Sequence, residues 1–223
     1  MKNFSFKQRI AGMNIAQKLT GGFGIISVFI MLNAILTIVI HFYSRSLQQK
    51  EAEEYLPVKS NLDVMMNKIT ESRRLVVNWV FVDHQPNTPD KVKLAAIVNT
   101  DFDVVLSEVK GKTSGWDAAF TDTLAAVDEK VHAFFDMERT VMSNLSTFDS
   151  YDDPILLMES EMLVQSDGDI EIAEKEIQGL MNSLIGICDA KCDAIKSSIN
   201  TSSTVQLVFV ILMSLLVLGT ALF

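Results

Sequence analysis

The sequence predicts an all-α fold: an antiparallel four-helix bundle anchored in a membrane by two transmembrane helices. Two runs, 21–42 and 204–223, contain no Asp, Glu, Lys or Arg. Each has the ~20 apolar residues that a helix needs to cross a hydrocarbon core of ~30 Å. Between the runs, apolar residues recur every three or four positions, which is typical of packed helices. No alternating pattern typical of a strand occurs.

The charge distribution predicts the orientation of these helices. Residues 1–20, an amphipathic lead-in, contain four basic residues and no acidic one, although the whole chain has a net charge of −9. Short basic flanks remain in the cytoplasm. We therefore expect residues 43–203 to be extracytoplasmic and 204–223 to return inward. The run 21–42 exceeds the ~7–15 apolar residues of a signal peptide and no cleavage site follows, which predicts an uncleaved anchor. The acidic balance argues against nucleic acid as a partner.

The first helix of the segment 43–203 is expected to continue directly from the first transmembrane run. Pro57 lacks a backbone donor and is expected to interrupt or kink it. Prolines and turn-forming residues in 83–89 end the helix. Its apolar positions alternate in steps of four and three and predict the buried face: Val58, Leu62, Met65, Ile69, Ser72, Val76 and Trp79.

Two shorter helices are expected to follow. Thr88 as N-cap and Pro89 at the first position begin the second helix, and the glycines of 111–115 end it. Its apolar residues are Leu94, Ile97, Val98, Phe102, Val105 and Val109. The third helix begins near Trp116 and ends within 146–153, with the apolar residues Phe120, Leu124, Val127, Val131, Phe134, Phe135, Val141 and Leu145.

The fourth helix begins at Pro154, with Asp153 as its cap, and is expected to run without a break into the second transmembrane run. Its apolar face comprises Ile170, Ala173, Ile177, Leu180, Leu184, Cys188, Ile195 and Ile199. Connections of about five to eight residues make consecutive helices antiparallel neighbours. Because the fourth helix must return to the membrane where the first left it, the two transmembrane helices are expected to be adjacent.

This order of segments resembles the sensory half of bacterial transmembrane receptors: methyl-accepting chemotaxis proteins and related kinases, cyclases and phosphatases. The likeness lies in the basic lead-in, the long first helix with Tyr55-Leu56-Pro57 beyond the membrane, the bundle and the return span. It implies transmembrane signalling by a homodimer in the bacterial inner membrane. A small-molecule ligand or a periplasmic binding protein would be the partner. Such receptors continue into a HAMP linker and a signalling module, so we expect the cytoplasmic output to lie outside this sequence. The alternative is a structural membrane protein whose helical bundle assembles with partner membrane proteins.

The sequence offers no catalytic pattern. Its three histidines, His41, His84 and His132, belong to no Ser-His-Asp or HExxH arrangement, which predicts no enzymatic activity for this chain. No cofactor is expected. The segment 166–171 has acidic residues around Gly168, but it lacks the full set of oxygen ligands of a calcium loop. We interpret it as a solvated stretch of helix and predict no metal site.

Arg73 and Arg74, the only adjacent basic pair, are the candidate ligand-binding residues. In aspartate-type chemoreceptors, arginines of the first helix bind a ligand carboxylate across the dimer interface, and the resemblance implies that role here. The Arg fork binds a carboxylate bidentately. At ~1.5 Å per residue the pair lies roughly 45 Å from the membrane, level with Asp169, Glu171 and Glu174, so an intramolecular salt bridge is the alternative. The apolar period places Arg73 beside the packed seam and Arg74 further round, facing water.

Cys188 and Cys192, the only cysteines, are spaced to lie on one helix face. A disulfide within one helical turn would be strained. Two interpretations remain: a pair of small apolar core residues, or an inter-subunit disulfide. A metal site is disfavoured because no His or further Cys lies near them in sequence.

Overall fold

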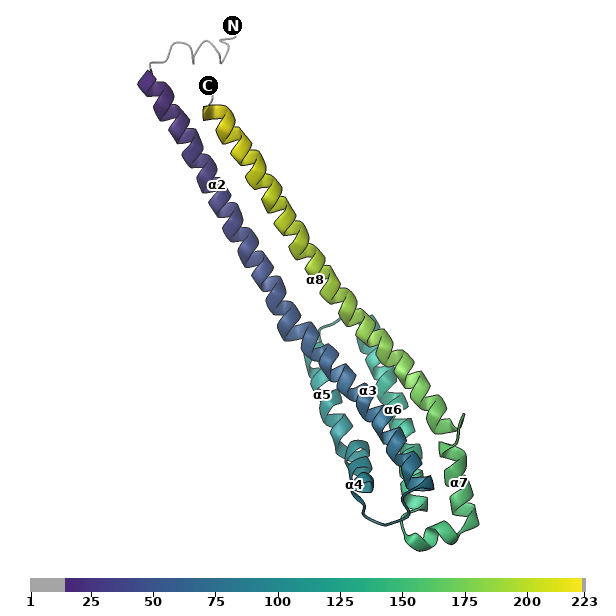
Figure 1. The fold of residues 1–223 in the computed structure, drawn as a ribbon. Helices are drawn as coiled ribbons and strands as arrows, with labels where there is room; N and C mark the ends of the chain where they lie inside the picture. Colours follow the sequence, from purple (N-terminus) through teal and green to yellow (C-terminus); the bar gives the residue numbers. More distant parts are fainter. Residues whose placement is uncertain (1–14, 222–223) are drawn as a thin grey trace. The chain divides into compact units, whose positions relative to one another are not determined.

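The structure, a computed structural model, describes residues 15–221 (Figure 1). These residues form helices and connecting turns, and no strand occurs among them. They divide into two compact units. The central unit comprises residues 51–192, and the terminal unit comprises the described residues before 51 and after 192. Most of the predicted lead-in, residues 1–14, and the last two residues lie outside the described part of the chain.

The terminal unit consists of α2 (Ile15–Lys50) and the later part of α8 (Asp169–Ala221). Both helices are long and apolar enough to cross a membrane, as far as length and composition decide this. Within this unit they are neighbours, because the Gln206 side chain donates a hydrogen bond to the Thr37 hydroxyl at 3.2 Å. Their large apolar side chains point outward, including Phe23, Ile30, Met31, Phe42, Leu207, Leu212 and Leu215.

Pro57 does not end the first long helix. A π-helical turn, η1 (Glu51–Tyr55), separates α2 from α3 (Leu56–Phe81). A proline ring clashes with the carbonyl four residues earlier, here that of Glu53, and a wider turn relieves such a clash. The predicted interruption is therefore a local widening after which α3 continues. Every apolar position predicted for α3 is buried, together with Leu75 and Val80.

The second predicted helix is divided. Pro89 begins α4 (Pro89–Ala96), another π-helical turn follows as η2 (Ile97–Asp101), and α5 (Phe102–Thr113) continues two residues beyond Gly111. Thr88 occupies the N-cap position as predicted, but its hydroxyl donates to the Asp83 carboxylate rather than capping the helix. The third predicted helix is α6 (Ala118–Asn144), and the Asp117 side chain accepts from the Phe120 amide as its cap.

The prediction of one unbroken fourth helix is wrong. A short 3-10 helix, η3 (Phe148–Asp152), precedes α7 (Pro154–Val164), whose cap is Asp153 as predicted. The chain then turns at 165–168 before α8 begins. Asp167 takes a left-handed conformation with φ of 60°. At Gly168, an added Cβ would lie 2.7 Å from the carbonyl oxygens of Met162 and Leu163. The stretch 166–171 is thus a turn followed by the first residues of α8, and its interpretation as a continuous stretch of helix is wrong.

The helices of the central unit share one hydrophobic core. Ion pairs between side chains of different helices show which helices are neighbours. On the α3–α8 side, Lys59 pairs with Asp189 and Arg73 with Glu171, which is an antiparallel order. Further pairs join α3 to η2, α5 to α6 and α6 to α8: Lys68–Asp101, Lys110–Asp128, Lys130–Glu176 and Lys191–Asp117. The largest fully buried side chains are Phe102, Phe120, Phe134, Leu62, Met65, Ile69, Leu75, Leu94, Ile97, Leu145, Ile170 and Ile177.

Candidate functional site

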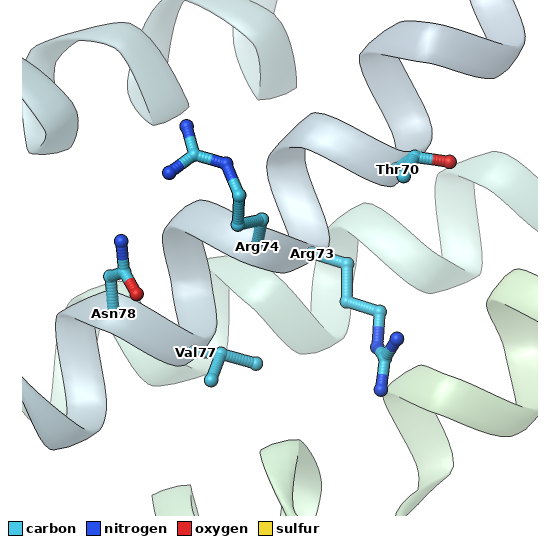
Figure 2. A pocket seen from close by; sticks show the side chains of 5 residues that line it. All are labelled: Thr70, Arg73, Arg74, Val77 and Asn78. Carbon is cyan, nitrogen blue, oxygen red and sulfur yellow. The ribbon is translucent and has the colours of Figure 1, made fainter.

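The predicted arginine pair lies in the C-terminal half of α3, on two different sides of that helix (Figure 2). An open depression surrounds it, lined by Thr70, Arg73, Arg74, Val77 and Asn78. All five residues belong to α3. One helix thus supplies the whole described lining, and the opposite side is open.

Arg73 is held within the chain. Its guanidinium lies 2.6 Å from the Glu171 carboxylate and 3.1 Å from that of Glu174, both on α8. Glu171 also binds Lys175 at 2.7 Å. Lys175 and then Arg73 hold the pKa of the Glu171 carboxyl below its ordinary value. The structure therefore contains the intramolecular salt bridge that the sequence left open as the alternative for Arg73.

Arg74 differs from Arg73 in exposure and in partners. Its side chain is 58% exposed, against 31% for Arg73, which agrees with the predicted orientation towards water. Its contact with Glu71 is long, at 3.8 Å, and Glu71 also binds Lys93 at 2.6 Å. The Arg74 guanidinium keeps most of its donors accessible to an incoming anion.

A buried acidic group lies at the same level and was missed by the sequence analysis. Glu138 of α6 is fully buried, and neither carboxyl oxygen has a hydrogen-bond partner among the described residues. Burial raises the pKa of the Glu138 carboxyl well above its ordinary value, and nearby Glu174 adds to this, whereas Ser72 and Arg139 oppose it. The carboxyl is therefore held in its neutral, protonated form over a wider pH range than an exposed Glu.

An aromatic cluster lies in the central unit where α3 ends and the loop to α4 begins, and it was also missed by the sequence analysis. The indole N–H of Trp79 donates to the Leu145 carbonyl at 2.9 Å. The Tyr151 hydroxyl donates to the Trp79 carbonyl at 2.7 Å, and the His84 ring lies 4.3 Å from the Tyr151 ring. Only Trp79 of these had been assigned to the core, because 79, 84 and 151 are brought together by the loops 82–88 and 146–153.

Both cysteines are buried in the central unit and form no disulfide. Burial, with smaller contributions from Cys192 and Asp189, raises the pKa of the Cys188 thiol to about 11. This position agrees with the interpretation as small core residues. The inter-subunit disulfide stays a prediction, and it would require the thiols to become exposed.

Within residues 15–221, no group of three or more His, Cys, Asp or Glu side chains is placed to hold a metal ion. His132 lies 3.1 Å from Asp128 on the exposed side of α6. The chain matches no protein-family model, no curated protein and no solved structure.

Proposed function

We propose that this chain is the sensory and transmembrane part of a bacterial receptor, and that it acts as a homodimer in the inner membrane. In this proposal α2 and the later part of α8 are the two transmembrane helices. The central unit is an extracytoplasmic, antiparallel four-helix bundle that binds a small molecule or a periplasmic binding protein. The output would be that of a chemoreceptor or of a HAMP-linked kinase, cyclase or phosphatase.

The observation that carries the proposal is the continuity of α8. The helix runs without interruption from Asp169 to Ala221. Its first part contributes Ile177, Leu184 and Cys188 to the core, and its last part is the uncharged run that begins at Thr204. Helix shifts of ~1–2 Å are an established means of signalling. A shift caused by ligand binding near Glu171 or Glu174 could pass along this helix.

The one-sided lining of the arginine depression supports the dimer. A depression built by α3 alone is completed when a second surface covers it, and a second copy supplies one by symmetry. Arg74 would then meet the ligand anion or the partner subunit. Arg73 would do so only by exchanging its contacts with Glu171 and Glu174.

A reporter fusion tests the proposal. Residues 1–223 are joined to the HAMP linker and kinase module of a characterised receptor, and kinase output is measured in cells while a library of small molecules is screened. We expect at least one compound to change the output. Inserting a flexible Gly-Ser segment between Ser203 and Thr204 should abolish that response. A helical insert of seven residues, which is one heptad or about two helical turns, should preserve it better. A fusion that is folded and membrane-inserted but responds to no compound would contradict the proposal.

A further inference from the structure

A second cavity lies in the central unit where α3 ends and α4 begins, apart from the arginine depression. It measures about 290 Å³ and is open to solvent. Its wall comes from the end of α3, the following loop, α4 and the end of α6: Trp79, Pro86, Asn87, Lys91, Val92, Ala95, Met142 and Ser146. One side of the cavity is therefore apolar and aromatic, and its charged group is the ammonium of Lys91.

Lys91 is unusually buried for a lysine, at 6% exposed. Its ammonium donates to the Tyr151 hydroxyl at 3.3 Å and lies 4.5 Å from the centre of the Trp79 ring and 5.5 Å from that of Tyr151. Among the described residues no carboxylate lies within ion-pair distance of it. An ammonium has three N–H donors, and the Tyr151 hydroxyl is the one hydrogen-bond acceptor that it has among the described residues.

The nearest acidic side chain does not neutralise this cation. The Asp83 carboxylate accepts from the Thr88 hydroxyl and from the Gln85 amide, so it organises the loop 83–88. Burial lowers the pKa of the Lys91 ammonium, and Asp83 offsets this only in part. An anion that entered the cavity would supply the missing counter-charge.

We propose that this cavity binds a small monocarboxylate with a short apolar tail. The carboxylate would accept from the Lys91 ammonium, with Asn87 and Ser146 on the rim as further polar partners. The tail would lie against Trp79, Val92 and Met142. The inference rests on the proposed sensory function, because it names the class of ligand that the receptor would detect.

Size and donor chemistry favour this class over phosphate. Drug-sized ligands occupy pockets of ~300–1,000 Å³, so a cavity of about 290 Å³ fits only a small molecule. Phosphate sites commonly present several donors, often from Arg forks or helix N-termini. Here a single ammonium faces apolar walls, which suits one carboxylate attached to a few methylene groups.

The test measures binding of sodium butanoate to the full chain in a non-ionic detergent. The chain has two tryptophans, so Trp116→Phe makes Trp79, in the cavity wall, the only fluorescent indole. We expect butanoate to change its emission saturably and sodium phosphate to leave it unchanged at matched ionic strength. Lys91→Met should weaken butanoate binding by ~10–100-fold, because a hydrogen bond to a charged group contributes ~1.5–3 kcal/mol. Lys93→Met, on the same helix but 55% exposed and paired with Glu71, should bind as the reference does.

A second variant keeps the test decisive if Lys91→Met fails to fold. Ala95→Leu fills the cavity and retains the ammonium, so it should also abolish the saturable change. The proposal is overturned if acetate, butanoate and hexanoate all give no saturable change, or if Lys91→Met and Ala95→Leu bind like the reference. A reporter fusion that responds to another compound while butanoate fails to bind would overturn the cavity proposal and leave the sensory function standing.

Discussion

Arg73 and Arg74 are adjacent on α3 but differ in exposure and in ion-pair partners. Arg73→Ala would leave Glu174, whose side chain is 6% exposed, without its cationic partner, so that of its two carboxyl oxygens only the one that accepts from the Gln178 amide would keep a described partner. A buried polar group without a partner costs about 1–3 kcal/mol, and in a chain of this size each kcal/mol lowers the melting temperature by about 2–4 °C. Arg74→Ala removes a 3.8 Å surface contact and should change stability by less than about 0.5 kcal/mol.

Thermal melts followed by circular dichroism, on the full chain in a non-ionic detergent, compare the two variants. Equal melting temperatures would show that the Arg73 ion pair contributes nothing measurable. Titration of a compound that activates the reporter fusion then separates stability from binding. We expect weaker affinity in Arg74→Ala if the arginine depression is its site.

Glu138 should make stability depend on pH. An unfolded chain releases the proton of this carboxyl near the ordinary value of 4.5, whereas the folded protein retains it because its pKa is raised. Stability therefore falls as the pH rises above 4.5 towards the raised pKa. Glu138→Gln mimics the protonated form, so we expect its melting temperature to exceed that of the wild type at pH 8 and to match it near pH 4. Glu129→Gln, exposed on the same helix, is the control. An unchanged pH profile in Glu138→Gln would show that the buried carboxyl is not the source.

The spacing of apolar residues along the sequence predicts that Arg73 lies beside the core, but it does not predict that Lys91 and Glu138 are buried. Arg73 follows Ser72 in a regular buried series, so its place beside the core is a matter of counting. Lys91 and Glu138 occupy buried positions on α4 and α6, yet charged residues are normally assigned to solvent. Tyr151, which accepts from Lys91, is far from it in sequence. Only the folded loops bring such partners together.

Among the helices, the break between α7 and α8 is the main departure from the predicted elements. Gly168→Ala should destabilise the chain by about 1–3 kcal/mol, the usual cost of forcing an extra carbon into packed atoms. The reason is that the added Cβ would lie 2.7 Å from two backbone carbonyl oxygens, which cannot move as a side chain can. Gly179 lies on the exposed side of α8, far from both ends of the helix, and a Cβ added there would have no atom within 4 Å. Gly179→Ala should therefore stabilise the folded chain by about 0.5–1 kcal/mol. Melting temperatures of the two variants test this, and a stabilised Gly168→Ala would contradict it.

Helix-capping residues, prolines at helix starts and the spacing of apolar residues predicted most of the helices correctly. Pro89 and Pro154 begin helices because a proline costs nothing where the first amides lack partners anyway, and Asp153 caps the second of these. The π-helical turns η1 and η2 could not be predicted in this way. Each inserts about one residue into a helix that remains continuous, so the apolar series shifts slightly without a visible stop. The turn at Gly168 does have a sequence signal, because Asp-Gly pairs favour tight turns, and this signal outweighs the helical spacing of the residues around it.

At the scale of the whole molecule, the charges of the sequence and the apolar helices support a single topology. The two candidate spans of the terminal unit are apolar and outward-facing, whereas the central unit buries its apolar residues in one core. The basic residues before Gly21 favour the cytoplasm, so the topology we propose has 43–203 on the other side of the membrane.

Labelling of single cysteines tests this topology. In a background of Cys188→Ala and Cys192→Ala, we introduce Gln85→Cys, in the exposed loop after α3, or Gln17→Cys, near the start of α2. We expect a membrane-impermeant maleimide to modify Gln85→Cys in intact cells with a permeable outer membrane. Gln17→Cys should react only after the inner membrane is opened, because the lysines and arginine around it keep that end in the cytoplasm. The reverse pattern would invert the topology, and labelling of both positions in intact cells would mean that the first run does not cross the membrane. The reverse pattern would also remove the route by which α8 could carry a signal inward, since its uncharged end would then leave the cytoplasm instead of entering it.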